Sequence, residues 1–328
     1  MKQYTINELQ EFVSAEIALV RKRLQQNSPS ALYIPIDYSL EMGGKRIRPL
    51  LLLISYNLFS DKIEMALPVA AAIEVFHNFT LLHDDIMDKA EVRRNRPTVH
   101  KKFSENNAIL SGDVMAFLSY RCLLETALKK QHAILALFTQ TAIEVCEGQQ
   151  LDMDFENRID VTESEYLEMI KLKTAVLLAC SLKAGALAAE ADDETAGLLY
   201  DFGLNLGLAF QLQDDLLDSF GDPAVFGKKI GGDIKANKKT FLLIKALEKA
   251  DEPTKSTLMK WLKTDSAEEE KVKAVLEIYK QLNIQAITQL KIDEYFKNCS
   301  DILNTLKIEA AKKENLRAIS NIMLNRVF

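Results

Sequence analysis

The stretch LLHDDIMDKAEVRR, residues 81–94, joins an apolar run to three carboxylates and two arginines: Asp84, Asp85, Asp88, Arg93 and Arg94. In a helix, Asp84 and Asp88 lie about 40° apart on one face. Two carboxylates at this spacing repel each other unless a cation lies between them. Mg²⁺ takes one or two carboxylates plus phosphate oxygens, so the nearby arginines favour Mg²⁺ bound together with a phosphate. The alternative is a solvated helix end that carries a run of charge.

The stretch FQLQDDLLD, residues 210–218, repeats the acidic spacing at Asp214, Asp215 and Asp218. It also follows an apolar helical run, and lysines follow it in turn. Two acidic runs of one spacing, each at the end of an apolar helix, favour two sides of one metal-lined cavity over two unrelated surface runs.

A third motif, GGKRIRP at residues 43–49, places cations beside flexible backbone. Gly43 and Gly44 end a helix, because glycine tolerates the backbone angles of a helix C-terminus. Lys45, Arg46 and Arg48 then precede or begin the next helix, where the helix dipole disfavours positive charge. A bound anion such as a diphosphate explains this arrangement better than an ordinary basic helix start.

Taken in order, these motifs resemble those of the trans-isoprenyl diphosphate synthases, the polyprenyl synthetase family, of the short-chain farnesyl or geranylgeranyl type. The resemblance runs from residue 43 to residue 240. It is carried by GGKRIRP, DDIMD with Arg93 and Arg94, GQQLD (148–152), Lys173-Thr174, FQLQDDLLD, and GKKIGGD…NKKT (227–240). One aspartate motif alone is weak evidence, whereas the ordered set is highly specific.

The resemblance implies Mg²⁺-dependent head-to-tail condensation of isopentenyl diphosphate with an allylic diphosphate. Metal ions, three per site, would lie on Asp84, Asp88 and Asp214, and Mn²⁺ can replace Mg²⁺. The phosphates of the allylic substrate would meet Arg93, Lys173, Lys228 and Lys238. Isopentenyl diphosphate would bind Lys45, Arg48, His77 and Arg94. A lone histidine on an apolar face is usually a core residue, but the resemblance favours a substrate contact for His77.

The remaining catalytic residues follow from the same comparison. Thr174 and Gln211 would direct oxygen dipoles at the allylic cation, and Asp85, Asp215 and Asp218 complete the two acidic motifs. A lysine inside an apolar helix, such as Lys173, needs a charged partner, and a diphosphate or an aspartate would serve.

Product length depends on the apolar face of the helix that leads to Asp84. Thr80 and Phe76 lie about 40° and 80° from Asp84 on the helical wheel, about 6 and 12 Å deeper. Phe79 lies about 140° away, although an aromatic residue at this position commonly limits length in the family. The usual bacterial farnesyl enzymes of the family have four residues between the second and third aspartates where this motif has two, and the eukaryotic ones have paired aromatics where this chain has the small Thr80. Both departures from the family pattern favour a pocket slightly deeper than C15 needs. We therefore predict all-trans C15 to C20 products, with C20 favoured.

Composition and helical periodicity favour one all-α domain over residues 1–328, and the resemblance implies a helical bundle around a deep central cavity. The chain has 12 glycines and 7 prolines in 328 residues, with no linker-like stretch, and 48% of its residues are hydrophobic. Helical periodicity runs through most of the chain, and no strand pattern is apparent.

The formal net charge of −6 argues against a nucleic-acid partner. The N-terminus has no apolar signal core, and residues 175–189 form too short a run for membrane insertion. The four cysteines lie far apart in apolar helical stretches and predict reduced thiols in a cytoplasmic protein. The resemblance adds an expectation of a homodimer.

Two alternatives remain. A class I terpene cyclase also ionises an allylic diphosphate, but needs neither the clamp at residues 43–48 nor a second DDxxD. A non-catalytic subunit of a heteromeric prenyl diphosphate synthase would be expected to lose one acidic motif, and this chain keeps both.

Overall fold

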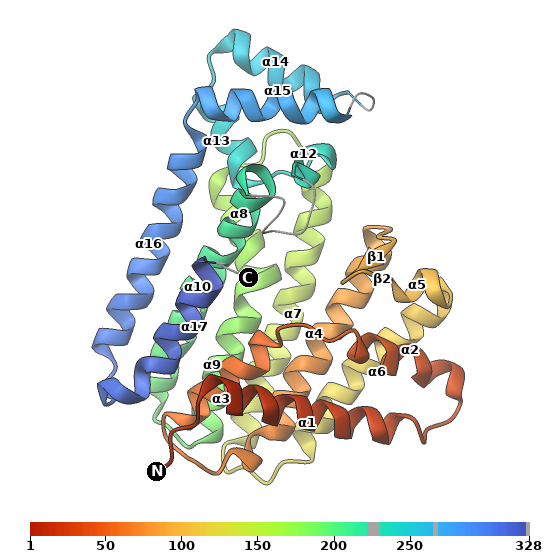
Figure 1. Cartoon of the computed structure of the whole chain (residues 1–328), viewed down its shortest axis with the longest axis vertical. Coiled ribbons are helices and arrows are strands. Elements are labelled where there is room, and N and C mark those ends of the chain that lie inside the picture. The colour runs from red at the N-terminus through yellow and green to blue at the C-terminus, as the bar shows by residue number, and fades with distance from the viewer. Residues whose placement is uncertain (222–229, 265–267, 326–328) are drawn as a thin grey trace. The chain divides into compact units, whose positions relative to one another are not determined.

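The computed structural model describes residues 1–221, 230–264 and 268–325, and helices dominate this part of the chain (Figure 1). The N-terminal elements are α1 (Ile6–Leu24), α2 (Ser30–Glu41), α3 (Ile47–Asn57), η1 (Ile63–Met65), α4 (Leu67–Met87), β1 (Val92–Arg93), β2 (Arg96–Pro97), α5 (Val99–Lys102) and α6 (Glu105–Leu124). The middle of the chain holds α7 (Gln131–Glu156), α8 (Glu163–Ile170), η2 (Lys171–Ala175), α9 (Val176–Ala188) and α10 (Asp193–Phe220).

The C-terminal elements are α12 (Gly232–Lys235), α13 (Phe241–Lys249), α14 (Glu252–Leu262), α15 (Glu268–Gln281), α16 (Ile284–Thr305), η3 (Ala310–Lys313) and α17 (Glu314–Asn325). The chain divides into two compact units. Unit 1 contains residues 1–139, 180–200 and 308–316, and unit 2 contains residues 140–179, 201–307 and 317–328. The predicted single domain with a central cavity stays a prediction.

Unit 1 is built around α4, which packs against α6, α3 and α1. A capping box at Thr5 and Glu8 begins α1, and the buried face of α1 repeats at helical spacing from Leu9 to Leu24. Nearly the whole circumference of α4 is buried from Val69 to Phe76, whereas its C-terminal turns are more open. A core that fixes the first half of α4 therefore holds its acidic end in place.

A short hairpin follows α4 and corrects the expectation that the chain has no strand. Strands β1 and β2 pair antiparallel, with Val92 opposite Pro97 and Arg93 opposite Arg96. Arg94 and Asn95 form the turn, at φ 52° and 60°. Two-residue hairpin turns favour positive φ at both central positions because their twist then matches that of the strands. Strands of two residues are too short for an alternating pattern to reveal them.

The core of unit 2 is formed where α8, α10, α13, α15 and α16 pack together, with large buried side chains such as Phe241 and Tyr279. In the same unit, α14 lies beside α15, as Figure 1 shows. Between α8 and α9 the backbone forms a π-helical turn, η2, which carries Lys173 and Thr174. Such turns contain one residue more than the α-helix and are frequent at functional sites.

Two glycines make room for this π-helical turn. A Cβ atom at Gly207 of α10 would lie 2.5 Å from the Cα atom of Ala175. A Cβ atom at Gly148 of α7 would overlap the backbone nitrogen of Lys173. Neither position admits a side chain without a shift of the backbone that carries Lys173 and Thr174.

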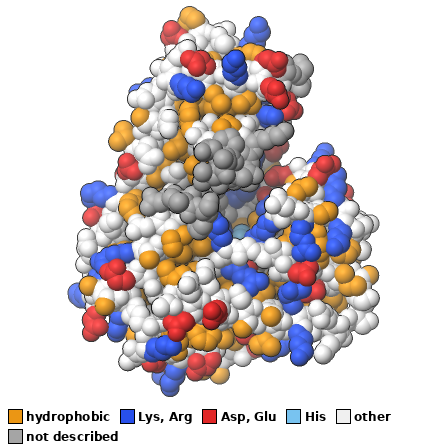
Figure 2. Space-filling model, viewed as in Figure 1, with side chains coloured by type: hydrophobic (Ala, Val, Ile, Leu, Met, Phe, Trp, Pro, Cys, Tyr) orange, Lys and Arg blue, Asp and Glu red, His pale blue; other side chains and the backbone are white. Residues whose placement is uncertain are grey.

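On the visible face of the described residues, Lys and Arg side chains alternate with Asp and Glu, and no patch of a single sign covers it (Figure 2). Within the described residues, no helix combines the length and the apolar character that crossing a bilayer requires.

Candidate active site

The first acidic patch, Asp84, Asp85 and Asp88, lies at the C-terminal end of α4 in unit 1. Its members differ in exposure. Asp85 is buried, Asp84 is partly buried, and Asp88 is exposed at the C-cap of the helix. The two carboxylates predicted to hold metal in unit 1, Asp84 and Asp88, are thus the more accessible members of the patch.

Arg93 of the hairpin turns back onto this patch. Its Nε donates to Asp85 Oδ1 at 2.8 Å, and its Nη2 donates to Asp84 Oδ2 at 3.3 Å. Asp85 is 3% exposed, and burial raises its pKa even though Arg93 acts in the opposite direction. Asp85 therefore serves first as the anchor of Arg93, which places the guanidinium beside Asp84.

A second group of cations lies between the start of α3 and the inner face of α4. Arg48 Nη1 is 3.0 Å from His77 Nε2, and since a guanidinium only donates, the imidazole nitrogen accepts. Burial and, to a smaller extent, the charge of Arg94 lower the pKa of Arg48 to about 10, although Glu74 acts in the opposite direction. The pKa of His77 falls well below its usual value, chiefly through burial and then through the charges of Arg48, Arg94 and Arg93. His77 is therefore neutral at pH 7.

The glycine loop and the hairpin meet above this group. Gly44 has φ 127°, and a Cβ there would come within 2.5 Å of Arg94 Nη2. Below it, Glu74 is 3% exposed, with Asn78 Nδ2 donating to its Oε1 at 3.1 Å and Arg46 Nε 4.0 Å away. Burial raises the pKa of Glu74. One carboxylate does not balance several crowded arginines, so this group of cations is suited to bind an anion.

The second acidic patch, Asp214, Asp215 and Asp218, lies near the C-terminal end of α10 in unit 2. It borders a cavity of about 120 Å³. The cavity is lined by Asp152, Tyr166, Met169, Ile170, Lys173, Thr174, Gln211, Asp214, Asp215, Asp233, Lys238, Lys239 and Thr240. The structure thus gathers the predicted residues Lys173, Thr174, Gln211 and Lys238 around one opening. Lys173 Nζ also donates to Asp152 Oδ2 at 2.6 Å, which gives this lysine an acidic partner.

Asp215 lines this cavity but is largely buried. It is 5% exposed, and the hydroxyl of Tyr166 donates to its Oδ2. The side-chain amide of Gln211 donates from Nε2 to Asp215 Oδ1 at 3.1 Å, and Thr174 Oγ1 donates to Gln211 Oε1 at 3.1 Å. Burial and the nearby Asp233 raise the pKa of Asp215.

Asp218 accepts hydrogen bonds from the backbone of the segment that follows α10. Its Oδ2 accepts from the backbone N–H of Asp233 at 3.0 Å, and its backbone oxygen accepts from Gly231 at 2.7 Å. Asp218 therefore fixes the start of the segment that carries Asp233 and Lys238. Lys228, also predicted to contact phosphate, lies outside the described residues.

The metal set predicted from the sequence draws Asp84 and Asp88 from unit 1 and Asp214 from unit 2, so the joint site stays a prediction. Among the described residues, no three His, Cys, Asp or Glu side chains are placed to hold a metal ion together. Mg²⁺ does not need such a cage, because it keeps waters and takes phosphate oxygens beside one or two carboxylates. The hard oxygen donors of each patch fit that requirement.

Sequence reasoning gave no role to several residues that the structure places at these patches. Glu74 was detectable as a single carboxylate in the apolar run VAAAIEVF, three residues before His77. Tyr166 had no such signal, because a tyrosine on the apolar face of a helix is typical of any core. Asp233 lies in the predicted motif, but nothing in the motif indicates its contact with Asp218.

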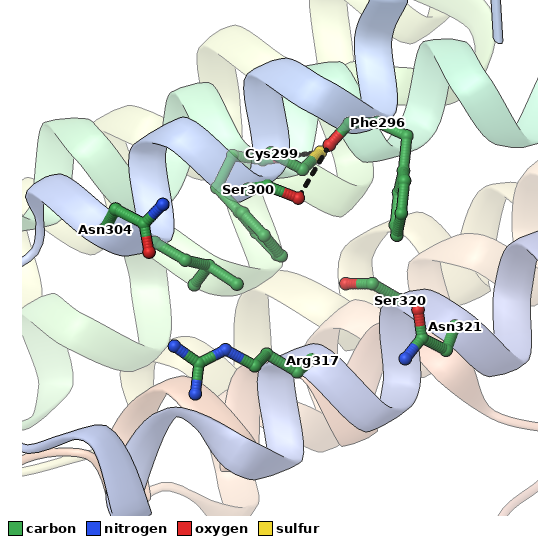
Figure 3. A pocket seen from close by; sticks show the side chains of 9 residues that line it. Phe296, Cys299, Ser300, Asn304, Arg317, Ser320 and Asn321 are labelled. Atoms are coloured by element: carbon green, nitrogen blue, oxygen red, sulfur yellow. Dashed lines mark hydrogen bonds between the residues drawn. The ribbon is translucent and has the colours of Figure 1, made fainter. Parts of the chain in front are cut away.

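A separate pocket of about 160 Å³ lies in unit 2, where side chains of α16 and α17 line its two sides (Figure 3). Its floor includes Phe202, and the Cys299 thiol donates to the Phe202 carbonyl at 3.6 Å. Burial raises the pKa of Cys299 to about 12, so the thiol is protonated and unreactive. No acidic side chain is among its described lining residues, and it is not the candidate active site.

Comparison with known proteins identifies the family of the chain. The sequence profile of the polyprenyl synthetase family matches residues 29–279. The geranylgeranyl diphosphate synthase of Sulfolobus acidocaldarius is 41% identical over 305 residues, 92% of each chain. The geranylfarnesyl diphosphate synthase of Natronomonas pharaonis is 40% identical over 246 residues, 69% of this chain and 72% of that one. A crystal structure of geranylgeranyl pyrophosphate synthase matches with a TM-score of 0.93 and 41% identity, covering 99% of this chain and 100% of that one.

The chain therefore belongs to the polyprenyl synthetase family. The predicted all-α fold and the predicted class of enzyme, a short-chain trans-prenyltransferase, are confirmed with it. Members of this family use isopentenyl and allylic diphosphates and bind prenyl diphosphates with a divalent metal.

Proposed function

We propose that this chain condenses isopentenyl diphosphate with an allylic diphosphate, head to tail, to give an all-trans C15 to C20 prenyl diphosphate. One observation carries the proposal. An acidic patch and a crowded group of arginines lie together on α4 and on the segments that contact it. Arg48 and His77 share a hydrogen bond, and the pKa of Arg48 is lowered to about 10. A diphosphate neutralises such a group better than a solvated surface does.

Isopentenyl diphosphate is assigned to Lys45, Arg48, His77 and Arg94. The guanidinium of Arg48 offers donors in a planar fork, and the neutral His77 holds one of them by accepting a hydrogen bond. Arg94 lies against Gly44, so the glycine loop and the hairpin present their cations to the same ligand. The allylic diphosphate is assigned to Arg93, Lys173, Lys228 and Lys238.

Asp84, Asp88 and Asp214 would hold the divalent metal, proposed to be Mg²⁺ at three ions per site, with Mn²⁺ as a substitute. When bound, the metal neutralises the leaving diphosphate and so favours cleavage of the allylic carbon–oxygen bond. Arg93 is held beside Asp84 by Asp85 and adds a fixed positive charge there. Lys173, paired with Asp152 at 2.6 Å, exchanges that partner for phosphate when substrate enters.

The carbon chemistry needs little from the side chains. The double bond of isopentenyl diphosphate attacks the allylic cation, a new carbon–carbon bond forms, and a proton is then lost. The oxygen atoms of Thr174 and Gln211 are assigned to the stabilisation of the cation, and the departing diphosphate takes the proton.

The 41% identity to a geranylgeranyl diphosphate synthase supports C20, whereas the geranylfarnesyl relative is compatible with a longer product at similar identity. A homodimer and a cytoplasmic location remain predictions. The alternatives of a terpene cyclase or a non-catalytic subunit gain no support from the relatives described above.

The test is prenyl transfer by the purified chain with dimethylallyl, geranyl and farnesyl diphosphate, with and without Mg²⁺. Asp84→Ala and Asp214→Ala should each lower turnover at least about 100-fold, roughly 3 kcal/mol of transition-state stabilisation. Both variants should fold, because removing one member of an acidic cluster relieves repulsion. Asp301→Ala is the control, since this exposed carboxylate pairs with Lys297 of the same helix, α16.

Near-normal turnover of either variant at saturating Mg²⁺ would contradict the assignment of metal to both patches. Cyclic hydrocarbon products from farnesyl diphosphate alone would favour the terpene cyclase. No transfer by the wild-type chain, with activity restored only by a second protein, would favour the non-catalytic subunit.

A further inference from the structure

The acidic patch of α10 is connected to the π-helical turn η2 by a continuous series of hydrogen bonds. The series begins at Tyr166 on α8, passes through Asp215 and Gln211 on α10, and ends at Thr174. Tyr166 is 2% exposed and Asp215 is 5% exposed. Each oxygen of the Asp215 carboxylate therefore accepts a hydrogen bond from a different side chain in a buried site.

This series fixes the orientation of an amide. A glutamine side chain can rotate so that its oxygen and its NH₂ group exchange places, and the neighbours decide which orientation is stable. One oxygen of Asp215 accepts from the Tyr166 hydroxyl and the other from Nε2 of Gln211, so the NH₂ group of Gln211 is held toward the carboxylate. The oxygen of Gln211 then faces Thr174 and accepts its hydroxyl proton. With that proton engaged, the lone pairs of the Thr174 oxygen remain for a positive charge in the cavity.

We propose that Tyr166 is a positioning residue for the ionisation of the allylic substrate, acting through Asp215 and Gln211 on Thr174. This inference rests on the proposed function, because it presumes that a cation forms beside Thr174. Without the Tyr166 hydroxyl, one oxygen of Asp215 loses its partner and the carboxylate can rotate away from Gln211. The amide can then present its NH₂ group, a positive dipole end, toward the developing cation.

The competing explanation is that Tyr166 only fills the core. Its ring packs near Phe241, with ring centroids 6.5 Å apart, and a phenylalanine would fill the same space. Tyr166→Phe therefore separates the two explanations, because it removes the hydroxyl and keeps the ring. Tyr279→Phe is the matched control. Tyr279 is a second buried tyrosine of the same core, and in the described structure its hydroxyl is not a donor to Asp215.

The first measurement separates binding from turnover. Tyr166→Phe should lower kcat about 10- to 100-fold, the effect of one lost hydrogen bond to a charged group. The KM for isopentenyl diphosphate should stay within about threefold. The Kd of a thiolo analogue of the allylic diphosphate, which does not ionise, should also stay within about threefold in calorimetric titration with Mg²⁺. Tyr279→Phe should leave kcat within about twofold. Equal kcat for Tyr166→Phe and wild type would overturn the proposal.

The second measurement is a double-mutant cycle with Thr174→Val, which removes a hydroxyl without changing the shape of the side chain. If Tyr166 acts through Thr174, the double variant should be no more than about twofold slower than Thr174→Val alone. Multiplied effects would mean that the two residues act independently, and would overturn the inference. If Tyr166→Phe does not fold, the same cycle with Gln211→Met tests the middle of the series by the same criterion.

The two proposals fail differently. A wild-type chain that transfers no prenyl group from any of the three starters would refute the proposed function. A wild-type chain that is active, with Tyr166→Phe unaffected, would refute only the role of Tyr166.

Discussion

Arg48 and His77 show how a single pair of residues prepares an anion site. The imidazole accepts a hydrogen bond from the guanidinium, so it orients Arg48 without adding charge. Burial and the neighbouring arginines keep the pKa of His77 well below its usual value, which preserves this neutral state across the physiological range.

Arg48→Ala should weaken the binding of isopentenyl diphosphate more than the binding of the allylic diphosphate. Each hydrogen bond lost to a charged phosphate costs about 1.5–3 kcal/mol, which raises the KM for isopentenyl diphosphate roughly 10- to 100-fold. Steady-state kinetics with each substrate varied in turn makes the comparison, and His132→Gln on the exposed surface is the control. An equal or larger rise in the allylic KM would show that Arg48 has been assigned to the wrong substrate.

The lowered pKa of His77 also makes stability depend on pH. Because the unfolded chain binds this proton at a higher pH than the folded protein, the folded state loses stability as the pH falls below about 6.5. The loss amounts to at most about 1.4 kcal/mol per pH unit down to the folded pKa, and it is absent above pH 6.5. Urea unfolding at pH 5 to 7 measures it.

His77→Gln should flatten this pH dependence, since glutamine does not titrate in that range. His132→Gln, at an exposed position of α7, is the matched control. The same slope in His77→Gln and in wild type would mean that other groups produce the pH dependence.

At the scale of elements, two glycines of α10 provide a matched pair. A Cβ atom at Gly207 would overlap Ala175 of the π-helical turn, whereas a Cβ atom at Gly197 meets nothing within 4 Å. Gly207→Ala should lower the free energy of unfolding by about 1–3 kcal/mol through overpacking. Gly197→Ala should raise it by about 0.5–1 kcal/mol, because alanine loses less backbone freedom in a helix.

Chemical denaturation of the two variants beside wild type tests this difference. Gly207→Ala should also lower kcat, since the backbone it displaces carries Thr174. If both substitutions stabilise the protein equally, the close contact between α10 and η2 does not exist in solution.

At the scale of the whole molecule, we expect the floor of the predicted cavity to set product length, and an aromatic cluster is the candidate for that floor. Phe76 is 2% exposed and lies between Phe79 and Phe138, with ring centroids 5.4 and 5.1 Å away. The hydroxyl of Thr80 donates to the His77 carbonyl at 2.8 Å, so it is directed along the helix. A chain growing along α4 would reach these rings.

Phe76→Ala or Phe79→Ala should therefore shift the products from C15–C20 to longer chains, because the removal of a ring opens space. Chromatography of dephosphorylated products gives the length distribution. Phe12→Ala is the control, since this ring packs on Tyr4 near the N-terminus. Wild-type products of C30 or more, or an unchanged distribution in both variants, would place the floor elsewhere.

The all-α fold and the motifs could be predicted from the sequence. Apolar residues at helical spacing indicate the helices, and the fixed spacing of the aspartates indicates the motifs. It could not show which aspartates are accessible. Asp84 and Asp85 are neighbours in one motif, yet only the folded protein shows that Asp85 is buried against Arg93. Tyr166 had no signal because its partner Asp215 is 49 residues away. The π-helical turn lasts only five residues, too few to alter the apolar periodicity.

That π-helical turn also sets the phase between α8 and α9. One surplus residue in a helix rotates everything beyond it by about 100° relative to an uninterrupted helix. Within unit 2, the buried face of α8 and the buried residues 176–179 at the start of α9 therefore differ in rotational setting, and the turn at residues 171–175 lies between them. Deleting one residue there would restore a regular helix but would turn either Tyr166 or the side chains of residues 176–179 away from their neighbours. The surplus residue therefore lets both segments of this helix bury their own side chains in the core of unit 2.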